Sequence, residues 1–466
     1  MPTLSRKNYL WYCIAVVLFG TAIPSAGQTK PFLQDIQVVR DEPGVASNPL
    51  IKKTSSVDAV TPAAISHSPI VTTIPVLENM AIPGYSGIIV EKVDGERVVE
   101  SGSNLTYNPA SNVKIATTYA VLKTFGPDYR FATSVWTDGS WEESTGTIYG
   151  NLYVSGRDPV FGFEHAVALA QELNRMGIRT VQGDLVVTDN FTMNYTTSAA
   201  TSSRSLFTTL DATKRSAAAN RVWQNFLVNS GRLSQTTAPN PSITFSGSVY
   251  VQSMPSNAKL VFSHESAPMR EIVKVMMCYS NNFLAERLGD LVGGPFAVAR
   301  IVQQNTGTQP AEFYLQSSSG LGINRVTPAS MMRLLRVLRN DLSRYRMSFA
   351  DIMPVAGIDK GTLEGRFDSD FAEGSVVGKT GTLGNTDGGV SALAGEMNTR
   401  GGRLLFVIFN QRGSVSRFRS FQNLYVSTIQ GQFGGAAPIS YSPISLDYRL
   451  SKTKFSYPAG RTMGSL

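Results

Sequence analysis

Short, mostly apolar runs bounded by turn residues lie near both ends of the chain, and such runs predict strands. The first covers residues 85–93 and is followed by Asp94-Gly95 and a second short apolar run. Asp-Gly between two such runs is typical of a β-hairpin. Further strand-like runs occupy residues 375–383, 390–394 and 403–409. The order of these runs favours an antiparallel sheet.

Helical periodicity appears between and after these runs. One predicted helix begins at Ser111 and ends before Gly126-Pro127, a common stop signal. An amphipathic segment over residues 269–288 is interrupted at residues 279–282, which predicts a break between two helices. Further helices are predicted over residues 164–176, 212–229, 328–338 and 415–429.

The middle of the chain mixes both patterns, with strands predicted over residues 147–155 and 182–188 and within residues 239–262. Two end segments have no sustained period. Residues 28–77 are rich in Pro, Ser, Thr and Val, and residues 433–466 are rich in Ser, Pro and Tyr. We interpret the first segment as a disordered linker and the second as an irregular tail.

The N-terminus has the order of features of a secretory signal peptide. Arg6 and Lys7 precede an apolar stretch over residues 9–23, and small residues follow. We expect cleavage near Ala26 or Gly27, so residues 1–27 would be removed and the mature protein would lie in the periplasm. The alternative interpretation is a short membrane anchor.

Composition and charge narrow the class of protein. Charged residues make up 16% of the 466 residues, against ~25% in an average domain, which excludes a charge-rich disordered chain and a coiled coil. No apolar run reaches the ~18–20 residues of a membrane span, which excludes a polytopic membrane protein. The formal charge is +8, which falls by two to +6 when Arg6 and Lys7 are removed. No long Lys/Arg block accompanies it, so an acidic partner other than nucleic acid is indicated.

Two cysteines and three scattered histidines do not form a disulfide framework or a dense His/Cys metal site. Cleavage of the leader would also remove Cys13. Cys278 would then be alone, so the exported protein would be stabilised by its core.

Three short motifs carry candidate chemistry, and they are Ser111-Asn-Val-Lys114, Ser280-Asn-Asn282 and Lys379-Thr380-Gly381-Thr382. Ser-x-x-Lys also occurs at Ser256 and Ser451, but only at Ser111 does it begin a predicted helix, where residues i and i+3 share a face. Ser-x-Asn and Lys-Thr-Gly each occur once. Taken singly, Ser111 could be an ordinary N-cap, Lys114 a solvated lysine, and Ser280-Asn281 a turn and cap.

The three motifs in this order resemble those of the penicillin-recognising serine enzymes. The surrounding residues resemble the D-alanyl-D-alanine carboxypeptidase/endopeptidase family, the class C low-molecular-mass penicillin-binding proteins. The resemblance covers roughly residues 78–430, and its matching stretches are residues 108–114, 183–187, 264–271, 280–286, 319–321, 324–325, 354–357, 378–383 and 390–395.

This resemblance implies an α+β fold, in which a β-lactamase/transpeptidase-like domain has an antiparallel sheet with helices on both faces and a helical lobe. Ser111 and Ser280 are 169 residues apart, more than two adjacent elements of one module require. We therefore expect a catalytic domain of residues 78–130 and 263–432, and an inserted α/β domain of residues 131–262. Full-length members of the family carry two nested insertions, whereas residues 131–262 are enough for one inserted domain.

The chemistry of the first two motifs can be worked out from residue types. A serine hydroxyl is a weak nucleophile until a base takes its proton. No histidine is close in sequence, and the setting of His264 before Pro268 is interpreted as structural. Lys114 is therefore the candidate base, with burial and a second cation such as Lys379 favouring its neutral form. Ser280 is suited to relay a proton to the leaving amine, and Asn282 to bind the peptide backbone.

The third motif is expected on an inner strand. The resemblance implies that Lys379 and Thr380 hold the terminal carboxylate of a D-Ala-D-Ala peptide, and that Gly381 and Thr382 also line the substrate. It places the oxyanion hole at the backbone amides of Ser111 and Thr382. Neither a metal nor a cofactor is implied.

Several positions depart from the family's pattern. Ser317-Ser-Ser-Gly-Leu321 stands where the family often has Asp-Gly-Ser-Gly-Leu, and Thr188, with Asp189 beside it, stands where Asp is common. We expect the second change to alter recognition of the substrate's diamino-acid side chain. The loop Gly384-Asn-Thr-Asp-Gly388 is longer than usual and is expected to alter the rim of the cleft.

We therefore predict an exported serine peptidase that cleaves D-Ala-D-Ala bonds or D-Ala–diaminopimelate cross-links of peptidoglycan stem peptides and is acylated by β-lactams. The positive charge also allows loose association with the membrane or the cell wall. Alternatives are a β-lactamase or esterase of the same fold, and a non-catalytic wall-binding relative. A phosphate loop at Gly374–Thr380 is rejected, because three residues separate its glycines where four are needed.

Overall fold

The computed structural model describes residues 68–232 and 240–459. The predicted signal peptide and residues 28–67 of the predicted linker lie outside this described part of the chain. Within the described ranges, no helix is both long enough and apolar enough to cross a membrane.

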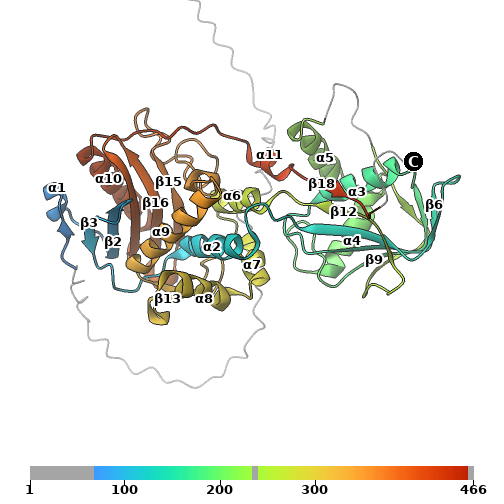
Figure 1. Ribbon diagram of the computed structural model, residues 1–466, viewed down its shortest axis with the longest axis horizontal. Coiled ribbons are helices and arrows are strands. Elements are labelled where there is room, and N and C mark those ends of the chain that lie inside the picture. The colour runs from blue at the N-terminus through green and yellow to red at the C-terminus, as the bar shows by residue number, and fades with distance from the viewer. Residues whose placement is uncertain (1–67, 233–239, 460–466) are drawn as a thin grey trace, which may run out of the picture. The chain divides into compact units, whose positions relative to one another are not determined.

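The predicted α+β fold is confirmed, and it is built on a sheet with the strand order β1-β3-β2-β17-β16-β15 (Figure 1). Every neighbouring pair is antiparallel. The hairpin predicted at Asp94-Gly95 joins β2 to β3. The strands are β1 (Val71–Thr72), β2 (Tyr85–Lys92), β3 (Arg97–Ser101), β15 (Val376–Leu383), β16 (Val390–Thr399) and β17 (Gly402–Gln411).

Helices cover both faces of this sheet (Figure 1). Successive residues of a strand point to opposite faces, so neighbours on β16 enter different cores. Leu393 packs with Phe421 of α10 (Val415–Gln432), whereas Ala392 packs with residues of α2 (Val113–Phe125) and α9 (Pro328–Arg344). The sheet is therefore the middle layer of three.

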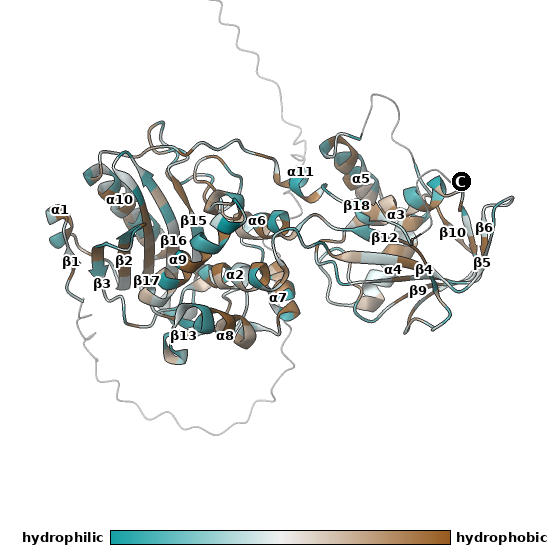
Figure 2. Ribbon diagram, in the orientation of Figure 1, coloured by the Kyte–Doolittle hydropathy of each residue, from teal (hydrophilic) through white to brown (hydrophobic). Residues whose placement is uncertain are grey.

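A helical lobe continues the core on the α2 side. It contains α6 (Met269–Tyr279), α7 (Asn282–Leu291) and α8 (Pro295–Thr306), whose buried residues share one core with α2 and α9. Hydrophilic and hydrophobic residues occupy different sides of α8 and α9 (Figure 2). This amphipathic pattern is typical of helices that cover a core.

The segment between α2 and α6 supplies all strands but one of two further sheets, with the orders β10-β8-β6-β5 and β11-β9-β7-β4-β12-β18, and β18 (Lys454–Ser456) comes from the tail. Ile148 and Val181 of the four-stranded sheet (β10-β8-β6-β5) share a core with Val135 and Val154 of the sheet that contains β12. The strands are β4 (Ala132–Thr137), β5 (Ser140–Glu142), β6 (Thr147–Tyr149), β7 (Leu152–Gly156), β8 (Thr180–Gln182), β9 (Leu185–Val187), β10 (Thr244–Phe245), β11 (Val249–Val251) and β12 (Lys259–Glu265). The helices are α3 (Phe163–Arg175), α4 (Ala199–Leu210) and α5 (Ala217–Asn229). The division of the chain at residues 131 and 262 stays a prediction.

The predicted limits of the linker and the tail need correction. Before residue 78, β1 pairs with β3, and Leu77 of α1 (Pro75–Glu78) is fully buried beneath the first sheet. The prediction of an irregular tail was also wrong, because the tail contains α11 (Leu446–Leu450) and β18 (Lys454–Ser456). β18 pairs with β12, and its Phe455 packs edge-on against Phe262.

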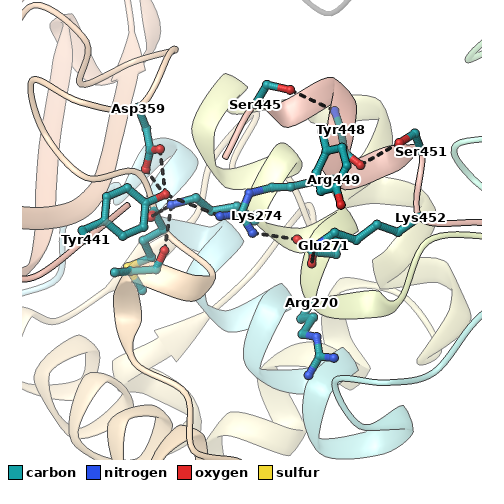
Figure 3. A network of polar contacts seen from close by, with 12 residues as sticks. Arg270, Glu271, Lys274, Asp359, Tyr441, Ser445, Tyr448, Arg449, Ser451 and Lys452 are labelled. Carbon is teal, nitrogen blue, oxygen red and sulfur yellow. Dashed lines mark hydrogen bonds and ion pairs between the residues drawn. The ribbon is translucent and has the colours of Figure 1, made fainter. Parts of the chain in front are cut away.

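Charged residues of the tail also contact α6 (Figure 3). Arg449 and Lys452 each donate to the Glu271 carboxylate over 2.6 Å. The fully buried Lys274, one turn further along α6, donates to Asp359 Oδ2 over 2.6 Å, and the Tyr441 hydroxyl donates to Asp359 Oδ1 over 2.8 Å. The tail therefore fixes the helix that leads into Ser280.

Candidate active site

The first motif lies at the start of α2. Ser111 belongs to a single 3-10 turn, Ala110–Asn112, and Lys114 lies in the first turn of the helix that follows. Lys114 Nζ is 3.0 Å from Ser111 Oγ and is fully buried. It donates to Asn282 Oδ1 and to the Ser319 carbonyl, each over 2.7 Å. The predicted serine–lysine pair is therefore brought together.

The second motif forms the break between α6 and α7. Ser280 ends α6 in the left-handed conformation, with φ of 56°. The Asn281 side chain caps α7 by accepting from the Leu284 amide over 3.0 Å. The tight break leaves Ser280 beside Lys379 and Asn282 beside Lys114. Asn281 thus supplies the cap, while its two neighbours face the other motifs.

The third motif lies on β15, which is an edge strand of the first sheet and not the inner strand that was predicted. Lys379 is fully buried, and its Nζ donates to Ser280 Oγ over 2.8 Å. The strand continues through Leu383 without turning into a helix, so the phosphate-loop alternative fails. An edge strand has backbone groups free to pair with an extended peptide.

Gly381 sets the distance between β15 and the Ser111 turn. A Cβ atom at this position would lie 2.6 Å from the Pro109 carbonyl oxygen and 3.0 Å from the Ser111 amide nitrogen. The first distance is shorter than normal contacts allow, so only glycine fits without a shift. The backbone of residues 381–382 is therefore held against the amide of Ser111.

Two contributors to the site carry no motif. The Ser319 carbonyl accepts from Lys114, and Glu286 of α7 accepts from the amides of Ser318 and Ser319 over 3.1 and 3.0 Å. Glu286 ends the stretch of residues 280–286 that resembles the family, and it lies four residues after Asn282, on the same side of the helix. A backbone carbonyl leaves no side-chain signal at all.

The departures from the family's pattern have local structural consequences. Ser317 Oγ donates to the Leu321 carbonyl over 2.8 Å and accepts from the Gly320 amide over 3.0 Å, so it closes the turn that carries Ser319. In the loop after β15, Asp387 accepts from both terminal nitrogens of Arg325.

Asp387 is the residue of the loop after β15 that forms an ion pair with Arg325. Burial disfavours its charged form, but hydrogen bonds from Arg325 and Asn108 outweigh burial and lower the pKa of the carboxyl group. Asp387 therefore joins this loop to Arg325 by an ion pair and to Asn108, three residues before Ser111, by a hydrogen bond.

The remaining reactive residue types are structural. The ring of His264 is fully buried on β12 and packs against Phe161, His165 and Phe455. Cys278 is buried and free, and burial raises the pKa of its thiol to about 12. Among the described residues, no group of three His, Cys, Asp or Glu is arranged to hold a metal ion.

A serine with a lysine one helical turn later, and a second serine paired with a second lysine beside an edge strand, define the penicillin-recognising serine enzymes. A family profile described as "D-Ala-D-Ala carboxypeptidase 3 (S13)" matches residues 75–202 and 214–423. The chain belongs to this family of serine peptidases.

Individual relatives agree with the family. A D-alanyl-D-alanine carboxypeptidase of Actinomadura sp. (strain R39) is 26% identical over 462 residues, covering 78% of this chain and 84% of the relative. Among solved structures, a predatory peptidoglycan endopeptidase of Bdellovibrio bacteriovorus has a TM-score of 0.66 at 21% identity, covering 81% of this chain and 100% of that one. Penicillin-binding protein 4 of Haemophilus influenzae has a TM-score of 0.55 at 20% identity, and the match covers 76% of this chain and 98% of that one. These structures share the fold.

Proposed function

We propose that the protein is an exported peptidase that removes the terminal D-Ala of peptidoglycan stem peptides, cleaves D-Ala–diaminopimelate cross-links, or does both, through an acyl-enzyme on Ser111. One observation carries the proposal, which is the position of the buried Lys114 amine between two carbonyl acceptors and Ser111 Oγ. A neutral amine has two N–H groups. If these donate to Asn282 Oδ1 and the Ser319 carbonyl, its lone pair faces the Ser111 hydroxyl.

In the first step, Ser111 Oγ attacks the carbonyl carbon of the penultimate D-Ala and its proton passes to Lys114. The charge that develops on the carbonyl oxygen is met by the backbone amides of Ser111 and Thr382. The contact at Gly381 supports this role, because it holds the strand against Ser111.

Collapse of this intermediate breaks the peptide bond and requires a proton on the leaving amine. Ser280 supplies that proton and is recharged from Lys114, and Lys379, which donates to Ser280 Oγ, orients the hydroxyl. Water then attacks the acyl-enzyme, with Lys114 or Ser280 taking its proton, and releases the shortened peptide. Asn282 binds the substrate backbone, and Lys379 and Thr380 bind its carboxylate.

The substrate and location follow from the same proposal. Relatives are described as acting on peptidoglycan or as acylated by penicillin G, and the predicted signal peptide would deliver this chain to the periplasm. We expect β-lactams to acylate Ser111 as substrate mimics.

The test is incubation of the full-length mature protein with purified pentapeptide muropeptides and cross-linked dimers. We expect release of D-Ala or cleavage of the dimer, and Ser111→Ala should reduce the rate by at least about 10³-fold. Ser256→Ala is the matched control, because Ser256 begins the same Ser-x-x-Lys pattern on an exposed turn. If the wild type cleaves neither substrate, or the Ser111 variant cleaves as fast, the proposal is wrong. Rapid turnover of penicillin without a lasting adduct would indicate a β-lactamase.

A further inference from the structure

Two guanidinium groups are associated with α10, and one of them contacts the C-terminal half of β15. Arg419 of α10 is exposed, and its Nη2 donates to Thr382 Oγ1 over 3.0 Å. Arg366 is buried behind it and donates to the Arg419 backbone carbonyl over 3.5 Å. Within residues 68–232 and 240–459, neither arginine forms an ion pair with a carboxylate.

The partners of Arg366 are neutral. Its guanidinium donates to Asn423 Oδ1 over 2.6 and 2.8 Å and to Gln422 Oε1 over 3.2 Å. Burial, and then the charge of Arg419, lower the pKa of Arg366 to about 10, so it is still a cation at neutral pH. A buried cation that has only neutral partners leaves a positive potential that an anion can compensate.

Both arginines lie on the face of the sheet to which the motif threonines point. Thr382 pairs with Ser391, and the Ser391 hydroxyl accepts from Gln422 of α10 over 3.2 Å. Thr380 pairs with Leu393, which packs with Phe421 of α10. Side chains at 380 and 382 therefore face α10, whereas Gly381 faces Ser111.

We propose that Arg419 is a second cationic anchor for the carboxylate of the substrate's leaving residue, which it binds together with the hydroxyls of Thr380 and Thr382. The inference rests on the proposed function and names a residue outside the three motifs. A guanidinium has five N–H donors, so Arg419 can keep its bond to Thr382 while it binds the carboxylate. Arg366 contributes positive potential from behind without touching the substrate.

The test compares a stem pentapeptide with the same peptide carrying a C-terminal amide. Arg419→Met should lower kcat/KM for the carboxylate substrate by about 10- to 100-fold, the usual effect of losing a charge-assisted hydrogen bond. It should leave the amide substrate nearly unchanged, because the amide has no charge to lose. Arg417→Met, at an exposed arginine on the same helix, should affect neither substrate, and Arg419→Lys should retain part of the activity.

A second measurement uses acylation instead of turnover. The rate at which Ser111 is acylated by benzylpenicillin and by its methyl ester is followed by mass spectrometry, and Arg419→Met should slow only the free acid. The proposed role of Arg419 would be wrong if Arg419→Met slowed the reaction of the free acid and of its amide or ester equally. It would also be wrong if the variant did not slow the reaction of the free acid. If the wild type neither cleaves the peptides nor is acylated, the proposed function itself fails.

Discussion

The atom attached to Cα at position 381 determines how closely β15 approaches the Ser111 turn. A methyl group there would lie 2.6 Å from the Pro109 carbonyl oxygen, so the strand or the turn must move by several tenths of an ångström. Both partners of that contact are backbone, which cannot swing aside as a flexible side chain would. The position of the backbone amides that we propose as the oxyanion hole therefore depends on glycine.

We predict that Gly381→Ala lowers kcat/KM on pentapeptide by about 100-fold, because a displacement of this order misaligns the reacting groups. Overpacking should also reduce the free energy of unfolding by roughly 1–3 kcal/mol. Gly384→Ala is the control, since a Cβ at 384 meets nothing within 4 Å, and it should change neither quantity. Steady-state kinetics and urea unfolding measure the two effects. Equal behaviour of the two variants would contradict the prediction.

At the residue scale, the site residues that could be predicted were those whose side chains form recognisable motifs. Ser111, Lys114, Ser280, Asn282 and Lys379 stand in short motifs whose spacing is meaningful on a helix or strand, and the structure brings these five together. The Ser319 carbonyl could not be predicted, because any residue has one. Arg419 could not be predicted either, since it lies 37 residues after Thr382 and belongs to no pattern.

At the element scale, most long periodic segments were predictable, although the helix α8 was not predicted, and short segments were not predictable. The strand over residues 376–383 and the break at Ser280 lie close to where the sequence pattern predicts them. β1 has two residues and β18 has three, too few for a period to appear. α4 was missed because its Ser- and Thr-rich sequence has low helix propensity, although Ser198 caps it. These elements are fixed by tertiary pairing.

The buried ion pair between Lys274 of α6 and Asp359 gives a prediction about stability. Lys274 is fully buried, and its Nζ donates to Asp359 and to the carbonyls of Ala350 and Met353. Lys274→Met should reduce the free energy of unfolding by roughly 3–5 kcal/mol, because it leaves a buried carboxylate without its cation. Urea unfolding followed by circular dichroism measures this change.

The matched control for that variant is Lys92→Met. Lys92 also pairs with a carboxylate over 2.7 Å, but both side chains are exposed. Exposed pairs contribute ~0–1 kcal/mol, so this variant should unfold almost as the wild type does. If Lys274→Met costs no more than Lys92→Met, the network in Figure 3 does not stabilise α6.

At the scale of the whole molecule, the order of the segments explains how distant motifs meet. The strands of the first sheet come from two blocks of sequence, residues 71–101 and 376–411. Between α2 and α6, the chain makes two further sheets and returns. Ser111 and Ser280 can therefore be far apart in sequence and still contribute to one site. The spacing alone predicted an insertion, but it could not predict that β18 of the tail returns to pair with β12.

His264, which is buried on β12, makes the free energy of unfolding depend on pH. Burial, with smaller contributions from the charges of His165, Arg232 and Arg130, holds the pKa of His264 well below its usual value. The unfolded chain therefore binds one more proton than the folded protein below about pH 6.5. The free energy of unfolding should fall by up to ~1.4 kcal/mol per pH unit as the pH decreases below that value. His264→Phe should remove this dependence.

Asp158, which interacts with His165, acts in the opposite direction. Burial raises the pKa of Asp158 from 3.8 to about 6. Between these two pH values the folded protein binds a proton that the unfolded chain does not bind, so the free energy of unfolding rises as the pH falls through this range. Asp158→Asn cannot make this gain, so its free energy of unfolding should fall more steeply with acid than that of the wild type, while His264→Phe should fall less steeply. Urea unfolding at pH 7, 6 and 5 for the three proteins separates the two effects. Parallel curves would show that neither group is coupled to folding.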